Sequence, residues 1–323
     1  MIDNEGEGSE RMAPCTVKKD LQPGDILIPK ERTRIKSGLQ RFSLHLRNMR
    51  LIGGDTVITA ALLPLLGFFL LHGLHDVPWL TIAGLFLVGI LLTATIFGLN
   101  NLTDAKIDAR DPLKQANHIN PIALGQLTQR EAMIPLLGCS LLALALAAWL
   151  SVLLWAFLAL TIGALYSLPP VRLKERAGLD LLAHSLVPLF ILLMGMAAAQ
   201  VNYPLRAVVG AAWVCLISAK SDTTNLIRDY DSDSEHNIGT TAVRLGIRAV
   251  WWLRLGLVLA AAGLLLFASC WGAFSLLPAL LVAAIVALEI LAIFRPGYYL
   301  LKQRLLLRMS YTAGGGIFVL LSG

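Results

Sequence analysis

Two short runs of polar residues repeat in this chain with the same composition and the same spacing. Each run is an asparagine followed by two aspartates at intervals of four: Asn100, Asp104 and Asp108 in the first acidic row, and Asn225, Asp229 and Asp233 in the second acidic row. Residues four apart on a helix lie on nearly the same face. Two such rows facing each other would repel unless divalent cations lay between them, and Mg²⁺ prefers these oxygen ligands. The spacing therefore predicts a Mg²⁺ site shared by both rows.

The composition of the chain predicts an integral membrane protein. Of its 323 residues, 56% are apolar and 15% are charged, and the mean hydropathy is +0.69. Nine apolar stretches approach the ~20 residues that a helix needs to cross a bilayer. They lie at residues 56–73, 80–99, 133–149, 152–167, 181–200, 205–221, 249–268, 274–294 and 307–321. Because only helices and closed barrels satisfy the backbone in lipid, we expect an all-α, multi-pass bundle of about nine transmembrane helices.

Basic residues lie mainly on alternate loops of this expected bundle. Of the 27 Lys and Arg residues, only Arg206 falls outside the segments 1–50, 106–130, 172–176, 220–254 and 295–308. Cytoplasmic loops carry an excess of Lys and Arg. The N-terminus, both acidic rows and the basic loops are therefore predicted to face the cytoplasm, with the C-terminus on the opposite side. This topology accounts for most of the net charge of +6, and no pattern of basic and aromatic residues indicates nucleic-acid binding.

The order of segments indicates a tail followed by a duplicated membrane domain. Residues 1–45 mix charged residues with Gly and Pro and are predicted to form a flexible cytoplasmic tail. Residues 46–323 form the membrane domain, and the two acidic rows recur 125 positions apart within it, from Asp104 to Asp229. The domain therefore divides into two pseudo-repeats, about 50–180 and 181–323. The loop after each row is long and charged, which favours a functional cap.

A third basic loop lies between the two rows in sequence. It reads Tyr166-Ser-Leu-Pro-Pro-Val-Arg172-Leu-Lys174-Glu-Arg176, and its two prolines are expected to end the preceding helix. Carboxylate rows that hold Mg²⁺, cations on the same membrane face and an apolar bundle together suit a diphosphate attached to a hydrophobic chain. Metal ions and cations would stabilise the leaving diphosphate as the carbon–oxygen bond breaks. The organic product of that step is an allylic carbocation, which apolar walls would keep from water.

These motifs resemble those of a known family. The stretch from Asn225 through Asp229 and Asp233 to Gly239-Thr-Thr-Ala-Val-Arg-Leu-Gly is similar to the second signature of the UbiA superfamily of intramembrane prenyltransferases. The row from Asn100 to Asp108 resembles that family's first signature. The segment that begins with Tyr166-Ser-Leu-Pro-Pro resembles its loop between helices 4 and 5.

The resemblance implies a nine-helix bundle around a central cavity with cytoplasmic cap loops, and an isoprenyl diphosphate as the donor. It further implies Mg²⁺ held by Asn100, Asp104, Asp108, Asn225, Asp229 and Asp233, of which the four aspartates are catalytic. Asp222 lies seven residues before Asp229 on the same helical face and is a candidate to join them. The candidates for contacting the diphosphate are Arg228, Arg172, Lys174 and Tyr166.

One segment departs from the family pattern. Many members carry an Arg-Pro pair in the first loop, whereas this chain has Asn120-Pro121, two residues after His118. Asn120 therefore replaces a cation at a position expected to approach the diphosphate or the acceptor. His118 is a candidate proton acceptor there, against the simpler reading of a solvated loop histidine. The departure leaves the identity of the acceptor open.

The leading functional interpretation is a Mg²⁺-dependent transferase that moves an isoprenyl group onto a lipophilic acceptor within the membrane lipid. An aromatic ring, a quinone precursor and a polyene all remain open as acceptors. The alternative is a terpene cyclase of the same superfamily, which would act on the diphosphate without an acceptor. A cation transporter is the third reading, and it is disfavoured because the predicted spans hold few ionisable residues away from their cytoplasmic ends.

Overall fold

The computed structural model of the chain describes residues 38–52, 61–73, 76–110, 115, 120–202 and 205–270. Within these ranges the regular elements are helices, which confirms the all-α prediction for this part of the chain. In chain order they are α1 (Gly38–Asn48), α3 (Leu63–His72), α4 (Trp79–Asp108), α6 (Gln129–Trp149), α7 (Leu153–Ser167), the 3₁₀ turn η1 (Leu173–Glu175), α8 (Leu179–Ala198), α9 (Leu205–Glu235), α10 (Thr241–Leu245) and α11 (Ile247–Cys270).

Seven of the nine predicted spans coincide with described helices, namely α3, α4, α6, α7, α8, α9 and α11. Among the described residues, α4, α6, α8 and α11 are long and apolar enough to cross a bilayer, and α3 and α7 are shorter apolar helices. The predicted spans 274–294 and 307–321 lie outside the described residues, so the count of nine stays a prediction.

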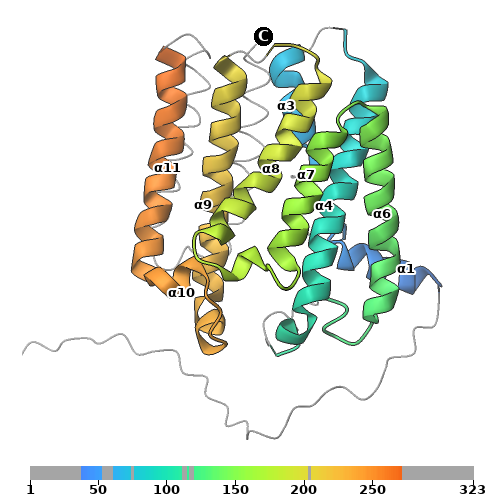
Figure 1. Cartoon of the computed structure of the whole chain (residues 1–323), viewed down its shortest axis with the longest axis vertical. Helices are drawn as coiled ribbons and strands as arrows, with labels where there is room; N and C mark the ends of the chain where they lie inside the picture. The colour runs from blue at the N-terminus through green and yellow to red at the C-terminus, as the bar shows by residue number, and fades with distance from the viewer. Residues whose placement is uncertain are drawn as a thin grey trace, which may run out of the picture. The chain divides into compact units, whose positions relative to one another are not determined.

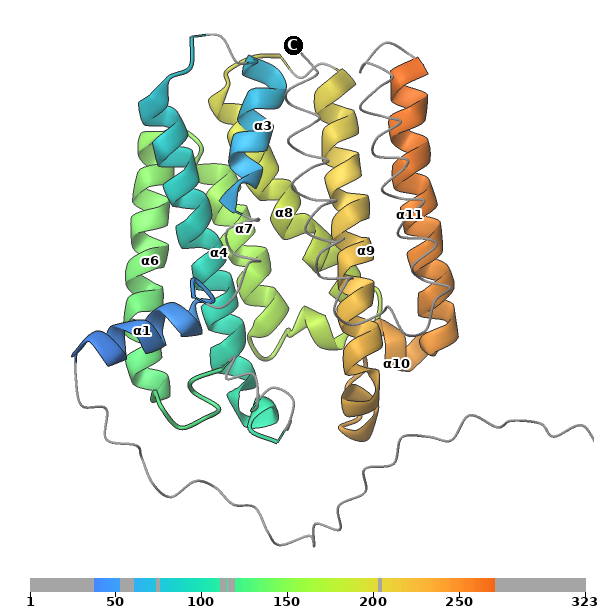
Figure 2. The same ribbon diagram turned by 180° about the vertical axis from the view of Figure 1, so that it is seen from behind.

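Helix α1 lies within and just beyond the segment predicted as a tail. It occupies Gly38–Asn48, so the end of the range 1–45 is helical, whereas residues 1–37 lie outside the described residues. The helix runs across the bundle rather than along it, beside α4 and α6 (Figure 2). The division of the chain into a tail and two pseudo-repeats stays a prediction.

Helix boundaries follow local sequence signals. Helix α6 begins with a capping box, in which Glu131 N–H donates to Oγ1 of Thr128 (3.2 Å) and Thr128 N–H donates to Oε2 of Glu131 (2.8 Å). Helix α7 ends at Ser167, two residues before the Pro169–Pro170 pair, as the sequence predicts. These signals fix where the chain leaves the bundle and enters the loops.

Helix α8 is the centre of the packing. It crosses the bundle obliquely and contacts α3, α7 and α9, while α4 packs on α6 and α9 packs on α11 (Figure 1). The main apolar core draws on most of the long helices and includes Phe68, Leu85, Leu192, Trp213 and Leu265. Because α8 touches helices from both predicted pseudo-repeats, it joins the two halves of the described bundle.

The backbones of α3 and α8 touch each other. A β-carbon at Gly67 of α3 would lie 2.1 Å from the carbonyl oxygen of Leu192, and one at Gly195 of α8 would lie 1.7 Å from the carbonyl oxygen of Pro64. Neither position can accept a side chain unless the helices separate. Small residues of this kind are typical of close helix packing in membranes.

The lengths of α4 and α9 place the acidic rows at one end of the bundle. The two helices contain 30 and 31 residues, and 30 residues at 1.5 Å each give about 45 Å. The hydrocarbon core of a bilayer is only about 30 Å thick. Each helix therefore extends past it, and the first and second acidic rows lie on the extensions at the same end of the bundle (Figure 1).

Candidate functional site

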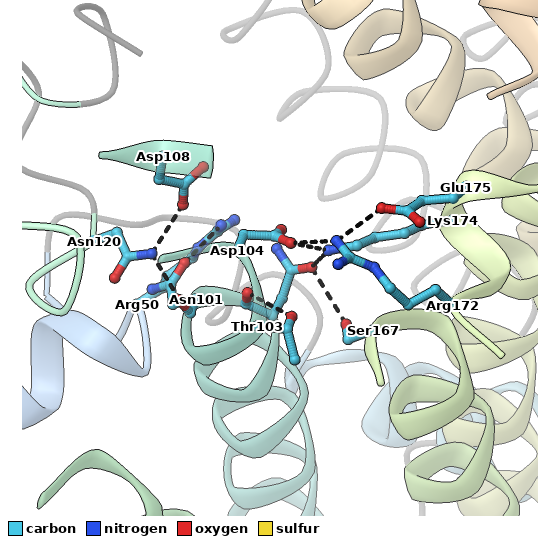
Figure 3. Close-up of polar contacts among 11 residues, drawn as sticks. Arg50, Asn101, Thr103, Asp104, Asp108, Asn120, Ser167, Arg172, Lys174 and Glu175 are labelled. Atoms are coloured by element: carbon cyan, nitrogen blue, oxygen red, sulfur yellow. Dashed lines mark hydrogen bonds and ion pairs between the residues drawn. The ribbon is translucent and has the colours of Figure 1, made fainter. Parts of the chain in front are cut away.

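The first acidic row meets two cations from the segment between α7 and α8. We call this segment, residues 168–178, the cation loop. The ammonium of Lys174 donates to Oδ1 of Asp104 (2.5 Å) and to Oδ1 of Asn100 (2.8 Å). The guanidinium of Arg172 donates to the same Oδ1 of Asp104 at 3.1 Å. The structure thus brings together four of the residues that the sequence predicts for the site (Figure 3).

The cation loop is shaped so that both cations point towards α4. The hydroxyl of Ser167, at the end of α7, donates to Oδ1 of Asn100 (3.3 Å). Arg172 adopts a left-handed backbone conformation (φ 38°) immediately before η1, and its guanidinium also pairs with Glu175 at 2.9 Å. The Nε of Arg172 is buried and has no hydrogen-bond partner among the described residues. A buried donor of this kind favours an anionic ligand.

The contact between Lys174 and Asp104 is shielded from water. Only 13% of the Lys174 side chain and 16% of the Asp104 side chain are exposed. Burial lowers the pKa of Lys174, while the adjacent carboxylate of Asp104 acts in the opposite direction. Charged groups interact more strongly in such surroundings than at a solvated surface. The loop and the row therefore form an electrostatic unit, not two solvated surfaces.

Asp108, the last member of the first acidic row, faces a different partner. The amide nitrogen of Asn120 donates to Oδ2 of Asp108 (2.9 Å) and to the carbonyl oxygen of Asn101 (2.7 Å). The Asn120 Oδ1 accepts from the backbone N–H groups of Ile122 (3.1 Å) and Ala123 (3.3 Å). Asn120 is buried and orients Asp108 while it shapes the following turn. His118 lies outside the described residues.

Sequence reasoning did not identify Arg50 and Asn101 as neighbours of the site. The guanidinium of Arg50 donates to Oδ1 of Asn101 (3.2 Å) and lies 4.8 Å from the centre of the Phe97 ring. Asn101 in turn donates to the carbonyl oxygen of Asn48 (2.8 Å). Burial lowers the pKa of Arg50, and the charges of Asp108 and Asp104 oppose this shift. No spacing in the sequence indicates a contact between residues 51 positions apart.

The second acidic row has mostly local partners. Arg228 donates to both carboxylate oxygens of its neighbour Asp229, from Nε at 2.8 Å and from Nη2 at 2.7 Å. Asn225 donates to Oδ1 of Asp222 at 3.3 Å. Asp233 lies near the end of α9, where its backbone carbonyl accepts from Ile238 N–H (2.8 Å). Arg228, predicted to contact the diphosphate, thus pairs with the row's own carboxylate.

Asp222 lies deeper in the bundle than the rest of its row. It is buried, and its Oδ1 lies 3.4 Å from Nδ1 of His184 on α8. Its Oδ2 is buried and has no hydrogen-bond partner among the described residues. Asp222 therefore links the second acidic row to α8, a contact that its position on the face of α9 did not indicate.

Tyr166 lies between the two rows. The charges that act on its hydroxyl come from Asp222, Asp180 and Asp229 on one side and from Asp104 on the other. Its ring is tilted against that of His184, with 6.3 Å between the ring centres. Because members of both rows act on one side chain, the two rows border the same region of the protein.

The oxygen atoms of the two rows fit a Mg²⁺ ion that is held jointly with an anionic ligand. Among the described residues, no three His, Cys, Asp or Glu side chains lie close enough together to hold an ion by themselves. Mg²⁺ does not need such a cage, because it is typically bound by one or two carboxylates, phosphate oxygens and water. The unpartnered Oδ2 of Asp222 is a further carboxylate oxygen that a cation would satisfy.

Comparison with known sequences identifies a family. The sequence model of the UbiA prenyltransferase family matches residues 61–310. The lycopene elongase/hydratase of Haloferax volcanii is 32% identical over 158 residues, which span 49% of this chain and 50% of that protein. The digeranylgeranylglyceryl phosphate synthase of Saccharolobus solfataricus is 27% identical over 212 residues, 63% of this chain and 70% of that protein. The chain thus matches about half the length of the Haloferax protein.

A solved structure has the same fold. It is a UbiA homologue from Archaeoglobus fulgidus bound to GPP and Mg²⁺, with a TM-score of 0.70 and 20% sequence identity. The match covers 86% of this chain and 98% of that one. The arrangement of helices around α8 is therefore that of a known membrane fold.

Proposed function

Because the chain belongs to the UbiA prenyltransferase family, we propose that it is a Mg²⁺-dependent intramembrane prenyltransferase. It transfers an isoprenyl group from an isoprenyl diphosphate to a lipophilic acceptor. The observation that carries this proposal is the convergence of Lys174 and Arg172 on Asp104 at the end of α4. Two shielded cations beside a carboxylate row suit a diphosphate and its metal ions better than they suit a structural ion pair, which would need only one cation.

The residues divide the work of diphosphate departure. Oxygen atoms of Asn100, Asp104, Asp108, Asn225, Asp229 and Asp233 would hold Mg²⁺, which when bound neutralises charge on the leaving diphosphate. Lys174 and Arg172 donate hydrogen bonds to diphosphate oxygens as the carbon–oxygen bond breaks and its electron pair stays on the diphosphate. Tyr166 and Asp222 border the same space and orient the donor. The allylic cation left behind forms a carbon–carbon bond with the acceptor, which then loses a proton.

The acceptor that we would test first is a linear polyene. The chain resembles, over half of each sequence, a protein named for lycopene elongation and hydration. An aromatic compound and a quinone precursor are the other acceptors to compare. Asn120 is no longer a strong indicator of acceptor class, because its amide is engaged by Asp108 and the adjoining backbone.

We propose further that the enzyme is a multi-pass membrane protein whose acidic rows and cation loop face the cytoplasm. The distribution of Lys and Arg supports this orientation, with the N-terminus on the same side and the C-terminus opposite. The lengths of α4 and α9, which extend the rows past the apolar part of each helix, support a reaction at the membrane boundary.

The first experiment is an assay of diphosphate release by the purified protein in detergent. Dimethylallyl, geranyl, farnesyl and geranylgeranyl diphosphates are each tested with and without Mg²⁺, and with lycopene or an aromatic acceptor. We expect Mg²⁺-dependent turnover that requires an acceptor. A prenyl product formed from the diphosphate alone would identify a cyclase instead. If no donor binds in the presence of Mg²⁺, and if ion flux in proteoliposomes depends on Asp104, the transferase proposal is wrong.

A further inference from the structure

A buried contact joins the start of α8 to the start of α10. Thr241 N–H donates to Oδ2 of Asp180 (2.6 Å), and the Thr241 hydroxyl donates to Oδ1 of the same carboxylate. The same hydroxyl accepts from the backbone N–H of Gly178 (2.7 Å). We call Gly178, Asp180 and Thr241 the latch. Its members lie 61 to 63 positions apart, at the lower end of α8 near α10 (Figure 1).

The latch is more than a favourable charge at a helix start. An aspartate in the first turn is commonly explained by the helix dipole, which a solvated carboxylate also satisfies. Asp180, however, is 1% exposed and Thr241 is 2% exposed. Both carboxylate oxygens of Asp180 accept hydrogen bonds from Thr241, and the hydroxyl of Thr241 is used as both donor and acceptor. The contact is therefore specific to these two segments.

The backbone around the latch is also in close contact. A β-carbon at Gly239 would lie only 3.0 Å from the carbonyl oxygen of Glu175. Gly239 belongs to the segment that follows the second acidic row, and Glu175 belongs to the cation loop. These two segments therefore lie directly against each other, with no room for a side chain between them.

A short path connects the latch to Lys174. The backbone N–H groups of Leu179 and Asp180 both donate to the carbonyl oxygen of Arg176, each at 3.0 Å. Arg176 N–H donates to the carbonyl oxygen of Leu173 (3.1 Å), which closes the η1 turn around Lys174. A shift of Asp180 would therefore move η1 and, with it, the ammonium that contacts Asp104.

We propose that Asp180 and Thr241 are positioning residues for the isoprenyl diphosphate donor. By fastening the cation loop to the segment after the second acidic row, they hold Lys174 and Arg172 beside the first acidic row. The latch thereby couples the two rows mechanically, although neither of its side chains contacts the donor. This inference rests on the proposed function, because it concerns the binding of that donor.

The test is a double-mutant cycle on the binding of geranyl diphosphate with Mg²⁺ to the full-length protein in detergent. Thr241→Val removes the hydroxyl but keeps the shape, and it should raise the Kd by about tenfold, which corresponds to about 1.4 kcal/mol. Thr241→Ser should restore the Kd to within about twofold of the wild type. The control is Thr93→Val, because the buried hydroxyl of Thr93 bonds only to Gly89 of its own helix (2.7 Å).

The coupling to Lys174 separates positioning from general stability. Lys174→Met should weaken binding in the wild type and in Thr93→Val by the same factor, and by a smaller factor in Thr241→Val. Equal factors in all three backgrounds, or an unchanged Kd in Thr241→Val, would overturn the latch while leaving the proposed function intact. Failure of the wild type to bind the donor overturns both. If Thr241→Val does not fold, Asp180→Asn, which keeps one oxygen acceptor, takes its place in the cycle.

Discussion

The first and second acidic rows match in sequence but differ in what holds them. Asn100 and Asp104 of the first row are contacted by Lys174 and Arg172, which lie 68 to 74 positions away. In the second row, Asp229 pairs with the adjacent Arg228, and Asn225 bonds to a residue three positions before it. The first row is thus held by tertiary contacts and the second by its own helix.

This difference indicates that a repeated motif need not have a repeated role. The shielded cations beside the first row are placed to receive the negative charge of a diphosphate. The half-exposed Arg228 instead partly neutralises its own row before any ligand arrives. We infer that the first row and the cation loop dominate recognition of the diphosphate, whereas the second row mainly contributes oxygen ligands for Mg²⁺.

The largest effect is expected from removing the central carboxylate of each row. Asp104→Ala should lower kcat/KM for the donor by about 10²–10³-fold, because it removes a metal ligand and leaves two shielded cations without their partner. Asp229→Ala should cost less, since it releases only Arg228, whose side chain is 50% exposed. Mg²⁺-dependent diphosphate release measures both. A larger loss in Asp229→Ala would reverse the ranking of the rows.

A sharper comparison uses the cations. Lys174→Met should raise the donor Kd by about 10- to 100-fold, because a buried, charge-assisted hydrogen bond is lost. Arg228→Met should change it by about threefold or less, as expected for an exposed ion pair. Calorimetric titration with geranyl diphosphate and Mg²⁺ gives both values. Equal effects would mean that Arg228 leaves Asp229 and binds the diphosphate when the donor arrives.

A smaller effect is expected from Asn120→Ala. The substitution removes the amide that orients Asp108 and bonds the carbonyl oxygen of Asn101, which should destabilise the protein by about 1–2 kcal/mol. It should also raise the Mg²⁺ concentration needed for half-maximal turnover by a few-fold. The control is Ser140→Ala, which removes only a hydrogen bond within α6. An unchanged Mg²⁺ requirement would mean that Asp108 does not contribute to metal binding.

The smallest effect is expected from Arg176→Ala. The side chain of Arg176 belongs to the same loop as Lys174 but is exposed, and its guanidinium contacts only the carbonyl oxygen of Pro170 at 3.4 Å. Exposed contacts of this kind contribute little, so kcat/KM should change by less than about twofold. The assay used for Lys174→Met checks this. A loss comparable to that of Lys174→Met would show that loop charge, and not the position of one ammonium, governs binding.

The sequence predicted the helices and the polar residues of the site better than it predicted their partners. Hydropathy located α4, α6, α8 and α11 because burial in lipid imposes a long apolar stretch on each. Four-residue spacing identified Asp104 and Asp229 for the same local reason. The contact between Asp180 and Thr241 and that between Arg50 and Asn101 join residues more than 50 positions apart. Packing alone decides such contacts, and neither periodicity nor charge distribution records it.

The close approach of α3 and α8 has a consequence for how the protein is made. Gly195 leaves the ribosome 128 residues after Gly67, its counterpart across the contact. At about 5–20 residues per second, α3 therefore waits roughly 6–26 seconds in the membrane before its partner exists. During this interval its glycine face is open to other helices. A substitution that lets this face pair early would harm the yield of assembled protein before it harmed any property of the finished molecule.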